Sequence, residues 1–246
     1  MWDDTRSNFE RNLAVVIGIN DYQNGVHNLS TPVNDAKALA DLLETEYEYQ
    51  EVIRLFPPHG EATLENLDKL LFDILPNKIK PTEADAVRLL FYFAGHGTAR
   101  NSKQGLSGYL LPQDANPVKL ESFLPMKKLY EALATLDCHH LLVILDCCFA
   151  GTFRWSSIRN VIAIPETIHK EHYDRFIRYR AWQVISSAAY NQEALDVAPH
   201  YLTDPRGMVD NSGHSPFAMA LLQGLSEQLE GEKTLVADLS KDGVIT

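Results

Sequence analysis

Two short stretches of the chain carry side chains that could act together in nucleophilic catalysis. Residues 141–145 are aliphatic, and one carboxylate and two thiols follow them at 146–148. Residues 89–93 form a similar apolar run, which is followed by His96 between two glycines. A thiol becomes a useful nucleophile when a neighbouring base favours the thiolate, and an imidazole can be that base. The two stretches therefore predict a cysteine–histidine pair.

Both runs have the length of a strand that is buried on both faces of a sheet. In α/β proteins, functional side chains gather at the edge where parallel strands end. The 52 residues from His96 to Cys148 (148 − 96) leave room for a crossover between neighbouring strands. We therefore expect one strand to deliver the thiol and its neighbour the imidazole. The alternative is that the cysteines fill the core and His96 is an ordinary loop histidine.

The rest of the chain alternates between patterns typical of strands and of helices. The expected strands are 13–19, 52–56, 89–94, 141–145 and 182–188, with a hairpin or short strand over 105–112. The expected helices are 36–43 after an Asn34-Asp35 cap, 63–74, 126–136 and 216–229. Such alternation predicts a mostly parallel sheet with helices on both faces.

Composition argues against several classes of function. The 246 residues, 45% of them hydrophobic, can bury a full core as one larger domain or as one domain with a small extension. A net charge of −11 argues against non-specific nucleic-acid binding, and no apolar run approaches the length of a membrane span. The three cysteines are too few and too clustered for a disulfide framework, and residues 1–12 lack the apolar core of a signal peptide. We therefore expect a cytoplasmic protein that binds neither nucleic acid nor membrane.

Two motifs carry a resemblance to a known family. Residues 92–97, Tyr-Phe-Ala-Gly-His-Gly, and residues 146–151, Asp-Cys-Cys-Phe-Ala-Gly, resemble the two catalytic motifs of the caspase-like cysteine peptidases (clan CD, peptidase C14). Within these, the chain is most similar to bacterial metacaspase-like proteins, and its His-to-Cys spacing fits that of caspases. Supporting matches lie at 15–20, 34–36, 108–112 and 213–217, so the resemblance covers about residues 13 to 229. It implies a caspase-like (caspase-hemoglobinase) fold, which is a three-layer α/β sandwich.

The resemblance also implies how the chain is divided. Residues 1–12 would be a lead-in, 13–230 the peptidase domain, and 231–246 the start of a truncated C-terminal extension. Within the domain, 13–151 resembles a large subunit, 152–181 is a candidate linker, and 182–230 resembles a small subunit.

The same motifs suggest which residues are catalytic. Metacaspases carry Asp-Ser-Cys-His-Ser-Gly, so aligning the first and last residues places Cys148 at the nucleophile position and Cys147 at the preceding serine. Phe149 and Ala150 replace the second histidine and serine of that motif. His96 would act as the base and then as the acid that protonates the leaving amine. The backbone N–H groups of Gly97 and Cys148 would form the oxyanion hole.

Substrate preference follows from the charge expected around the residue before the scissile bond, called P1. Caspases hold an acidic P1 residue with two arginines, and the positions that we align with them are Leu29 and Leu195. Neither can bind a carboxylate. Metacaspases instead hold Arg or Lys with carboxylates, one of them at the position of Asp146, and a guanidinium is the best partner for such a group. The alternative is that Asp146 only caps local backbone N–H groups.

A second carboxylate of this S1 pocket would be expected within 187–192. That segment holds Tyr190 and Asn191 instead of an acidic residue, so the pocket is weaker or uses Glu193 or Asp196. The proposed preference is therefore for Arg or Lys at P1, and a preference for Asp is the alternative.

The resemblance further implies a regulated effector protease, made as a zymogen, of the kind used in bacterial defence or cell death. Its partners would be protein or peptide substrates and an activating protein or a regulatory C-terminal domain. The candidate self-cleavage sites are the basic residues of the linker: Arg154, Arg159, Lys170, Arg175, Arg178 and Arg180. The alternative is that the linker is an ordinary solvated segment. No cofactor is required for the chemistry. Ca²⁺, which many metacaspases need, is a candidate activator, although the sequence has no EF-hand spacing and no metal site is expected.

Other classes stay open as alternatives. The chain could be a catalytically silent caspase-like module that acts as a binding scaffold, although both catalytic residues are present. A Cys–His acyl transferase or a zinc site is disfavoured, because the cysteines lack ligand spacing and a second pair.

Overall fold

A five-stranded parallel sheet forms the centre of the molecule. The computed structural model describes residues 11–80, 87–102, 105–153, 180–188, 194, 196 and 213–226. The strands are β1 (Arg11–Gly18), β2 (Glu51–Leu55), β3 (Val87–Ala94), β7 (His140–Asp146) and β8 (Ala181–Ser186). They are ordered β2-β1-β3-β7-β8, and every neighbouring pair is parallel. The predicted parallel sheet is confirmed.

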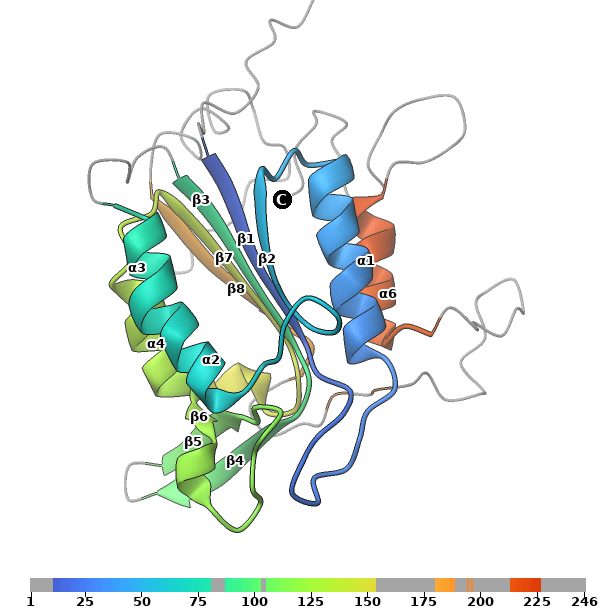
Figure 1. Cartoon of the computed structure of the whole chain (residues 1–246), viewed down its shortest axis with the longest axis vertical. Helices are drawn as coiled ribbons and strands as arrows, with labels where there is room; N and C mark the ends of the chain where they lie inside the picture. Colours follow the sequence, from blue (N-terminus) through green and yellow to red (C-terminus); the bar gives the residue numbers. More distant parts are fainter. Residues whose placement is uncertain are drawn as a thin grey trace, which may run out of the picture.

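Helices cover both faces of this sheet (Figure 1). On one face lie α1 (Pro32–Thr45) and α6 (Pro216–Leu225). On the other lie α2 (Leu64–Lys69), a π-helical turn (Leu70–Ile74), α3 (Leu75–Lys78) and α4 (Met126–Ala134). The result is the expected three-layer α/β sandwich. Among the described residues, no helix combines the length and apolar character that crossing a membrane requires.

Alternate residues of the central strands face opposite layers. In β1, Leu13, Val15 and Ile17 pack into the core beneath α2 and α4, whereas Ala14 and Val16 pack against α1. All five side chains are fully buried. Such strands appear in a sequence as continuous apolar runs because both of their faces are covered. The same alternation decides on which side of the sheet each residue of the site lies.

The first helix begins earlier than its sequence pattern predicts. Thr31 is the N-cap and Pro32 occupies the first turn, where its fixed φ suits a helix and its missing N–H costs nothing. Asn34 and Asp35, predicted as the cap, therefore lie inside the first turn. Their side chains reach across to residues 213–215 instead of capping α1.

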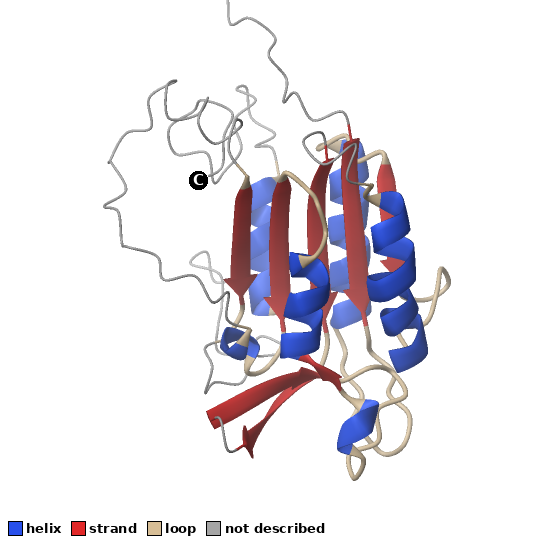
Figure 2. Ribbon diagram, turned by 90° about the vertical axis from the view of Figure 1, so that its left-hand side faces the viewer, coloured by secondary structure: helices blue, strands red, loops and turns tan. Residues whose placement is uncertain are grey.

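A second, antiparallel sheet follows His96 directly. It consists of β4 (Gly97–Ser102), β5 (Gly105–Leu110) and the short β6 (Leu124–Pro125). Figure 2 shows it beyond the edge at which the central strands end. The sequence predicted a hairpin or short strand over 105–112 but not β4, because its residues, Gly-Thr-Ala-Arg-Asn-Ser, show no apolar alternation.

The remaining elements lie within a few residues of their predicted bounds, and the predicted helix 63–74 extends through the π-helical turn to Lys78. Residues 1–10, 154–179 and 227–246 lie outside the described residues. The predictions that concern the lead-in, the linker and the C-terminal extension therefore stay predictions.

Candidate active site

The sheet register brings the loop of His96 and the loop of Cys148 side by side. In the β3–β7 ladder, Ala94 pairs with Asp146, so each candidate catalytic residue stands two positions beyond a paired residue. The Gly95 N–H donates to the Asp146 carbonyl oxygen at 3.2 Å, which continues the contact past the strands. The predicted thiol and imidazole are thus delivered by neighbouring strands to one edge.

Gly97 packs directly on the loop that carries Cys148. A Cβ atom at this position would lie 2.1 Å from the Cys148 carbonyl oxygen and 3.1 Å from the Cys147 Sγ. Close approach, and not a positive φ, is what requires glycine here. The backbone of residue 97 and that of residue 148 are therefore in contact.

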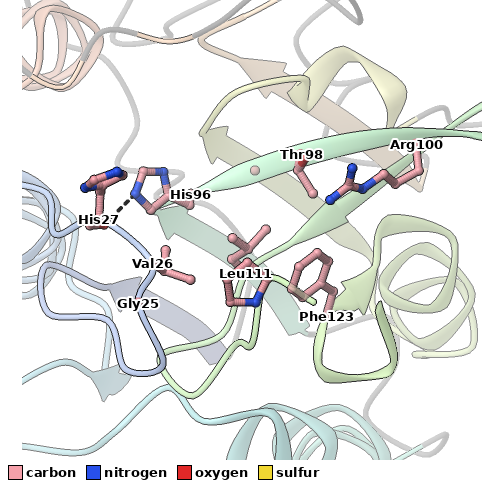
Figure 3. Close-up of a pocket in the computed structure, with 10 residues that line it drawn as sticks. Gly25, Val26, His27, His96, Thr98, Arg100, Leu111 and Phe123 are labelled. Atoms are coloured by element: carbon pink, nitrogen blue, oxygen red, sulfur yellow. Dashed lines mark hydrogen bonds between the residues drawn. The ribbon is translucent and has the colours of Figure 1, made fainter. Parts of the chain in front are cut away.

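Hydrogen bonds fix the His96 ring and its proton. Nε2 lies 2.8 Å from the carbonyl oxygen of His27 (Figure 3). A carbonyl only accepts, so Nε2 carries the hydrogen, and in the neutral imidazole Nδ1 is the nitrogen that can accept a proton. The His96 N–H donates to the Tyr22 hydroxyl at 2.7 Å, and the two rings pack at a tilt. Burial raises the pKa of Tyr22, so this hydroxyl stays protonated.

The backbone N–H of Gly97 is not used by the small sheet. Leu111 donates its N–H to the His96 carbonyl oxygen at 3.0 Å. In an antiparallel ladder, hydrogen-bonded and non-hydrogen-bonded residue pairs alternate. Because His96 and Leu111 are hydrogen-bonded, the next pair, Gly97 and Leu110, is a non-hydrogen-bonded pair. The Gly97 N–H is therefore available beside Cys148, where the sequence predicted an oxyanion donor.

The two adjacent thiols have different environments. Cys147 is 1% exposed and packs in the core beneath α4, and burial, with a further contribution from Asp146, holds the pKa of its thiol well above the usual range. Cys148 is half-buried, and its Sγ lies 3.9 Å from the Ala194 carbonyl oxygen. Only the thiolate is a nucleophile. The environment of Cys147 disfavours it for that role and leaves Cys148 as the candidate.

The turn after Cys148 is backbone-strained. Phe149 has φ 57° and ψ 19°, the left-handed region, which costs a residue with a side chain about 1–2 kcal/mol. A single turn of 3₁₀ helix, Ala150–Thr152, follows. The Gly151 N–H donates to the Ala188 carbonyl oxygen at 3.0 Å, which anchors this turn beyond β8. Nothing in the sequence pattern predicts a left-handed phenylalanine.

Two buried carboxylates meet on the opposite face of the sheet from Cys147. Asp146 is 7% exposed and Asp35, from α1, is 1% exposed. Ser215 joins them: its Oγ donates to Asp146 Oδ2 at 2.7 Å, and its N–H donates to Asp35 Oδ2 at 3.3 Å. The Nδ1 of His214 lies 2.6 Å from Asp35 Oδ1. Burial raises the pKa of both carboxyls, and hydrogen bonding partly offsets this.

The hydroxyl of Tyr92 belongs to the same group. Tyr92 lies on β3 two pairs before Ala94, on the face that packs against α1. Its hydroxyl is buried and has no hydrogen-bond partner among the described residues. Burial raises its pKa, and the charges of Asp146 and Asp35 raise it further, so the Tyr92 hydroxyl stays protonated. Such an unsatisfied buried group is unusual and calls for an explanation.

The other predicted S1 residues lie in different situations. Asp196 accepts hydrogen bonds from the backbone N–H groups of Ser30 and Thr31 at 2.8 and 3.1 Å, so its carboxylate is already engaged beside α1. It is close enough to contribute to the raised pKa of Asp146. Glu193 lies outside the described residues. Sequence reasoning missed Asp35, although Asn34-Asp35-Ala36 was among the matching motifs.

Three comparisons with known proteins place this geometry in context. A family model described as "Caspase domain" (Peptidase_C14) matches residues 11–241. Among solved structures, the Drosophila initiator caspase Dronc matches with 15% identity and a TM-score of 0.41, over 58% of this chain and 50% of that one. The chain thus spans only half the length of that relative. Among curated proteins, no sequence matches the chain. In the described part of the chain, His, Cys, Asp and Glu side chains form no cluster of three that could hold a metal ion.

Proposed function

The chain belongs to the caspase-domain family of cysteine peptidases, and from that premise we propose that it is an endopeptidase that cleaves after Arg or Lys. Cys148 is the nucleophile and His96 its base. The observation that supports this proposal is the β3–β7 register, in which the strands that precede His96 and Cys148 are neighbours and end at the same edge of the sheet.

In the first half of the reaction, Nδ1 of His96 takes the proton of the Cys148 thiol, and the thiolate attacks the carbonyl carbon of the scissile bond. The carbonyl π electrons move to the oxygen, where the N–H groups of Gly97 and Cys148 stabilise the oxyanion. When the tetrahedral species collapses, the C–N bond breaks and His96 returns its proton to the leaving amine. The acyl group is then held as a thioester on Cys148.

The second half releases the enzyme. Water attacks the thioester carbonyl while His96 accepts one of its protons. The C–S bond breaks, the thiolate is reprotonated, and the product carboxylic acid leaves. The bond of Nε2 to the His27 carbonyl supports this role, because it keeps the ring oriented and Nδ1 available through both halves.

Preference for a basic P1 residue is supported by the carboxylate pair. Asp146 is the residue two positions before the nucleophile, and Asp35 meets it through Ser215. A buried carboxylate is costly unless it is paired, and His214 contacts only Asp35 of this pair, so a guanidinium would supply the charge partner that Asp146 lacks among the described residues. The Tyr92 hydroxyl would supply a further acceptor for the same cation. We propose that these three side chains form the base of S1.

The test is hydrolysis of fluorogenic peptides with Arg, Lys or Asp at P1, assayed with added Ca²⁺ and with a chelator. Wild type is compared with Cys148→Ala and Cys147→Ala. Cleavage after Arg or Lys that is lost only in Cys148→Ala is the expected result. Cleavage after Asp would overturn the pocket assignment but keep the catalytic pair. No cleavage under any condition, with a folded protein, would favour the scaffold alternative.

Regulation by self-cleavage within 152–181 is part of the proposal. Most of the candidate residues, Arg154 to Arg178, lie outside the described residues. Arg180 is described, and its Nη1 pairs with Asp137 Oδ1 at 2.6 Å just before β8. This contact disfavours Arg180 as a cleavage site, because cutting there would require the start of β8 to detach. Mass spectrometry of wild type and Cys148→Ala after incubation identifies any cleaved bond.

A further inference from the structure

A cavity opens beside His96, away from the carboxylate pair. Its volume is about 310 Å³, and neither Asp35, Asp146 nor Cys148 lines it. Its walls come from the loop after β1, from β4, and from the segments that flank β5 and β6 (Figure 3). The proposed catalytic imidazole therefore lines a space that is separate from the proposed S1 group and that the reaction described above does not use.

One face of β4 forms a wall of this cavity. Successive residues of a strand point to opposite faces, so His96, Thr98 and Arg100 share one face, and all three line the cavity. At about 3.3 Å per residue, the backbone of Arg100 is about 13 Å from that of His96. The wall thus leads from the catalytic histidine to a guanidinium.

The walls next to His96 are apolar, and the titratable groups are basic. Val26, Leu111 and Phe123 supply aliphatic and aromatic surface. The titratable lining residues are His27, His96 and Arg100, and no acidic side chain is among them. On a chain with a net charge of −11, a cavity with only basic groups stands apart from the average surface.

Arg100 has no side-chain partner among the residues that the structure describes. It is exposed, and no ion pair or hydrogen bond engages its side chain in the described structure. The other described arginines are engaged: Arg11 with Glu51, Arg54 with Asp41 and Glu44, Arg88 with Asn12, and Arg180 with Asp137. A guanidinium at the end of an apolar cavity is suited to a carboxylate that arrives with a ligand.

We infer that this cavity is the subsite for the part of a peptide substrate that follows the scissile bond, and that it selects an apolar residue first and an acidic residue two or three positions after the bond. This inference rests on the proposed peptidase function. His96 protonates the leaving amine, so the leaving segment must pass on its side of the site. An extended peptide covers about 7–10 Å in two or three residues, which brings their side chains within reach of Arg100.

The experiment uses three substrates that are identical up to a P1 arginine. One continues with Leu-Asp-Asp, one with Leu-Lys-Lys, and a short reference ends in a fluorogenic amine. The readout is kcat/KM for each long substrate divided by kcat/KM for the reference. Wild type is compared with Arg100→Glu and with the control Lys127→Glu, which makes the same charge change at a largely exposed position outside the cavity.

Wild type is expected to prefer Leu-Asp-Asp over Leu-Lys-Lys by about fivefold, the size of an exposed charge pair. Arg100→Glu is expected to reverse this preference, and Lys127→Glu to preserve it. Equal ratios in wild type, or the same ratios in Arg100→Glu as in wild type, would overturn the inference.

If none of the substrates is cleaved, the proposed function fails and binding alone decides the inference. The probe is a labelled peptide that begins with Leu-Asp-Asp, titrated with Cys148→Ala and with Cys148→Ala/Arg100→Glu while fluorescence anisotropy is measured. Binding that weakens about fivefold in the double variant supports the subsite. Equal binding by both proteins, or no binding by either, refutes it.

Discussion

Replacing Gly97 by alanine is expected to disable catalysis without unfolding the chain. The new Cβ would lie 2.1 Å from the Cys148 carbonyl oxygen, whereas ordinary contact begins at 3.4 Å, so the two loops must separate by about 1.3 Å (3.4 − 2.1). The obstructing atom belongs to the backbone of Cys148, the proposed nucleophile, and cannot rotate away as a side chain could. A displacement of about 1 Å in a catalytic group costs about 100-fold in rate, which corresponds to about 2.7 kcal/mol in the barrier.

The assay is kcat for an Arg fluorogenic peptide, with the thermal midpoint measured in parallel. Gly60→Ala is the matched control. Its Cβ would approach Leu55 Cδ2 at 3.2 Å, the end of a flexible side chain, and the Arg54 carbonyl oxygen at 3.3 Å, so only a small adjustment is required. Gly97→Ala should lose about 100-fold in kcat, and Gly60→Ala less than threefold.

Wild-type kcat in Gly97→Ala would refute the contact between the two loops. A loss of kcat accompanied by a large fall in the thermal midpoint would refute the narrower claim that the substitution acts on catalytic geometry. Gly97→Ser, which adds the same Cβ, must reproduce the Gly97→Ala result.

Four further predictions concern the site. Iodoacetamide should alkylate Cys148 of the native protein at least tenfold faster than Cys147, because Cys147 is buried and the pKa of its thiol is raised. Mass spectrometry of peptide fragments measures both alkylation rates. Asp146→Asn should raise KM for an Arg substrate about 10–100-fold by removing a charge-assisted contact, with Asp35→Asn acting in the same direction. Because burial raises the pKa of the Asp146 and Asp35 carboxyls, both are protonated at a higher pH than exposed aspartates. Protonation removes the negative charge that would bind the P1 cation, so wild-type KM should rise as the pH falls through these raised pKa values. Measuring KM from pH 8 to pH 5 tests this direction. Phe149→Val should lower the thermal midpoint and kcat more than Phe149→Asn, because a β-branched residue tolerates the left-handed region least.

The fold was largely predictable because its central strands are buried on both faces. Leu13 to Ile17 and Leu141 to Leu145 form continuous apolar runs. Such runs are the clearest indication in the sequence of buried parallel strands. The position of the proposed catalytic pair follows from where two such runs end. The sequence did not predict β4, because Gly97 to Ser102 has few apolar side chains. This segment is extended because it pairs with β5.

The carboxylate pair shows the limit of local reasoning. Asp35 has the local pattern of a helix cap, and that interpretation was wrong because Pro32 starts α1 earlier. Its actual contacts, with His214 and Ser215, join positions about 180 residues apart in sequence. No spacing rule relates such residues. The left-handed conformation of Phe149 is likewise imposed by the turn that surrounds it, since a phenylalanine does not favour it.

The sheet and the carboxylate group also determine what happens if the chain is cut between residues 153 and 180. The part after the cut is held by the β7–β8 ladder, by the contacts of His214 and Ser215 with Asp35 and Asp146, and by the bond from Tyr47 to the Leu225 carbonyl. None of these contacts needs a continuous chain. Two separately produced polypeptides could therefore assemble by fragment complementation. The second would bring Ser215 to carboxylates supplied by the first, and recovered cleavage after arginine would report the assembly.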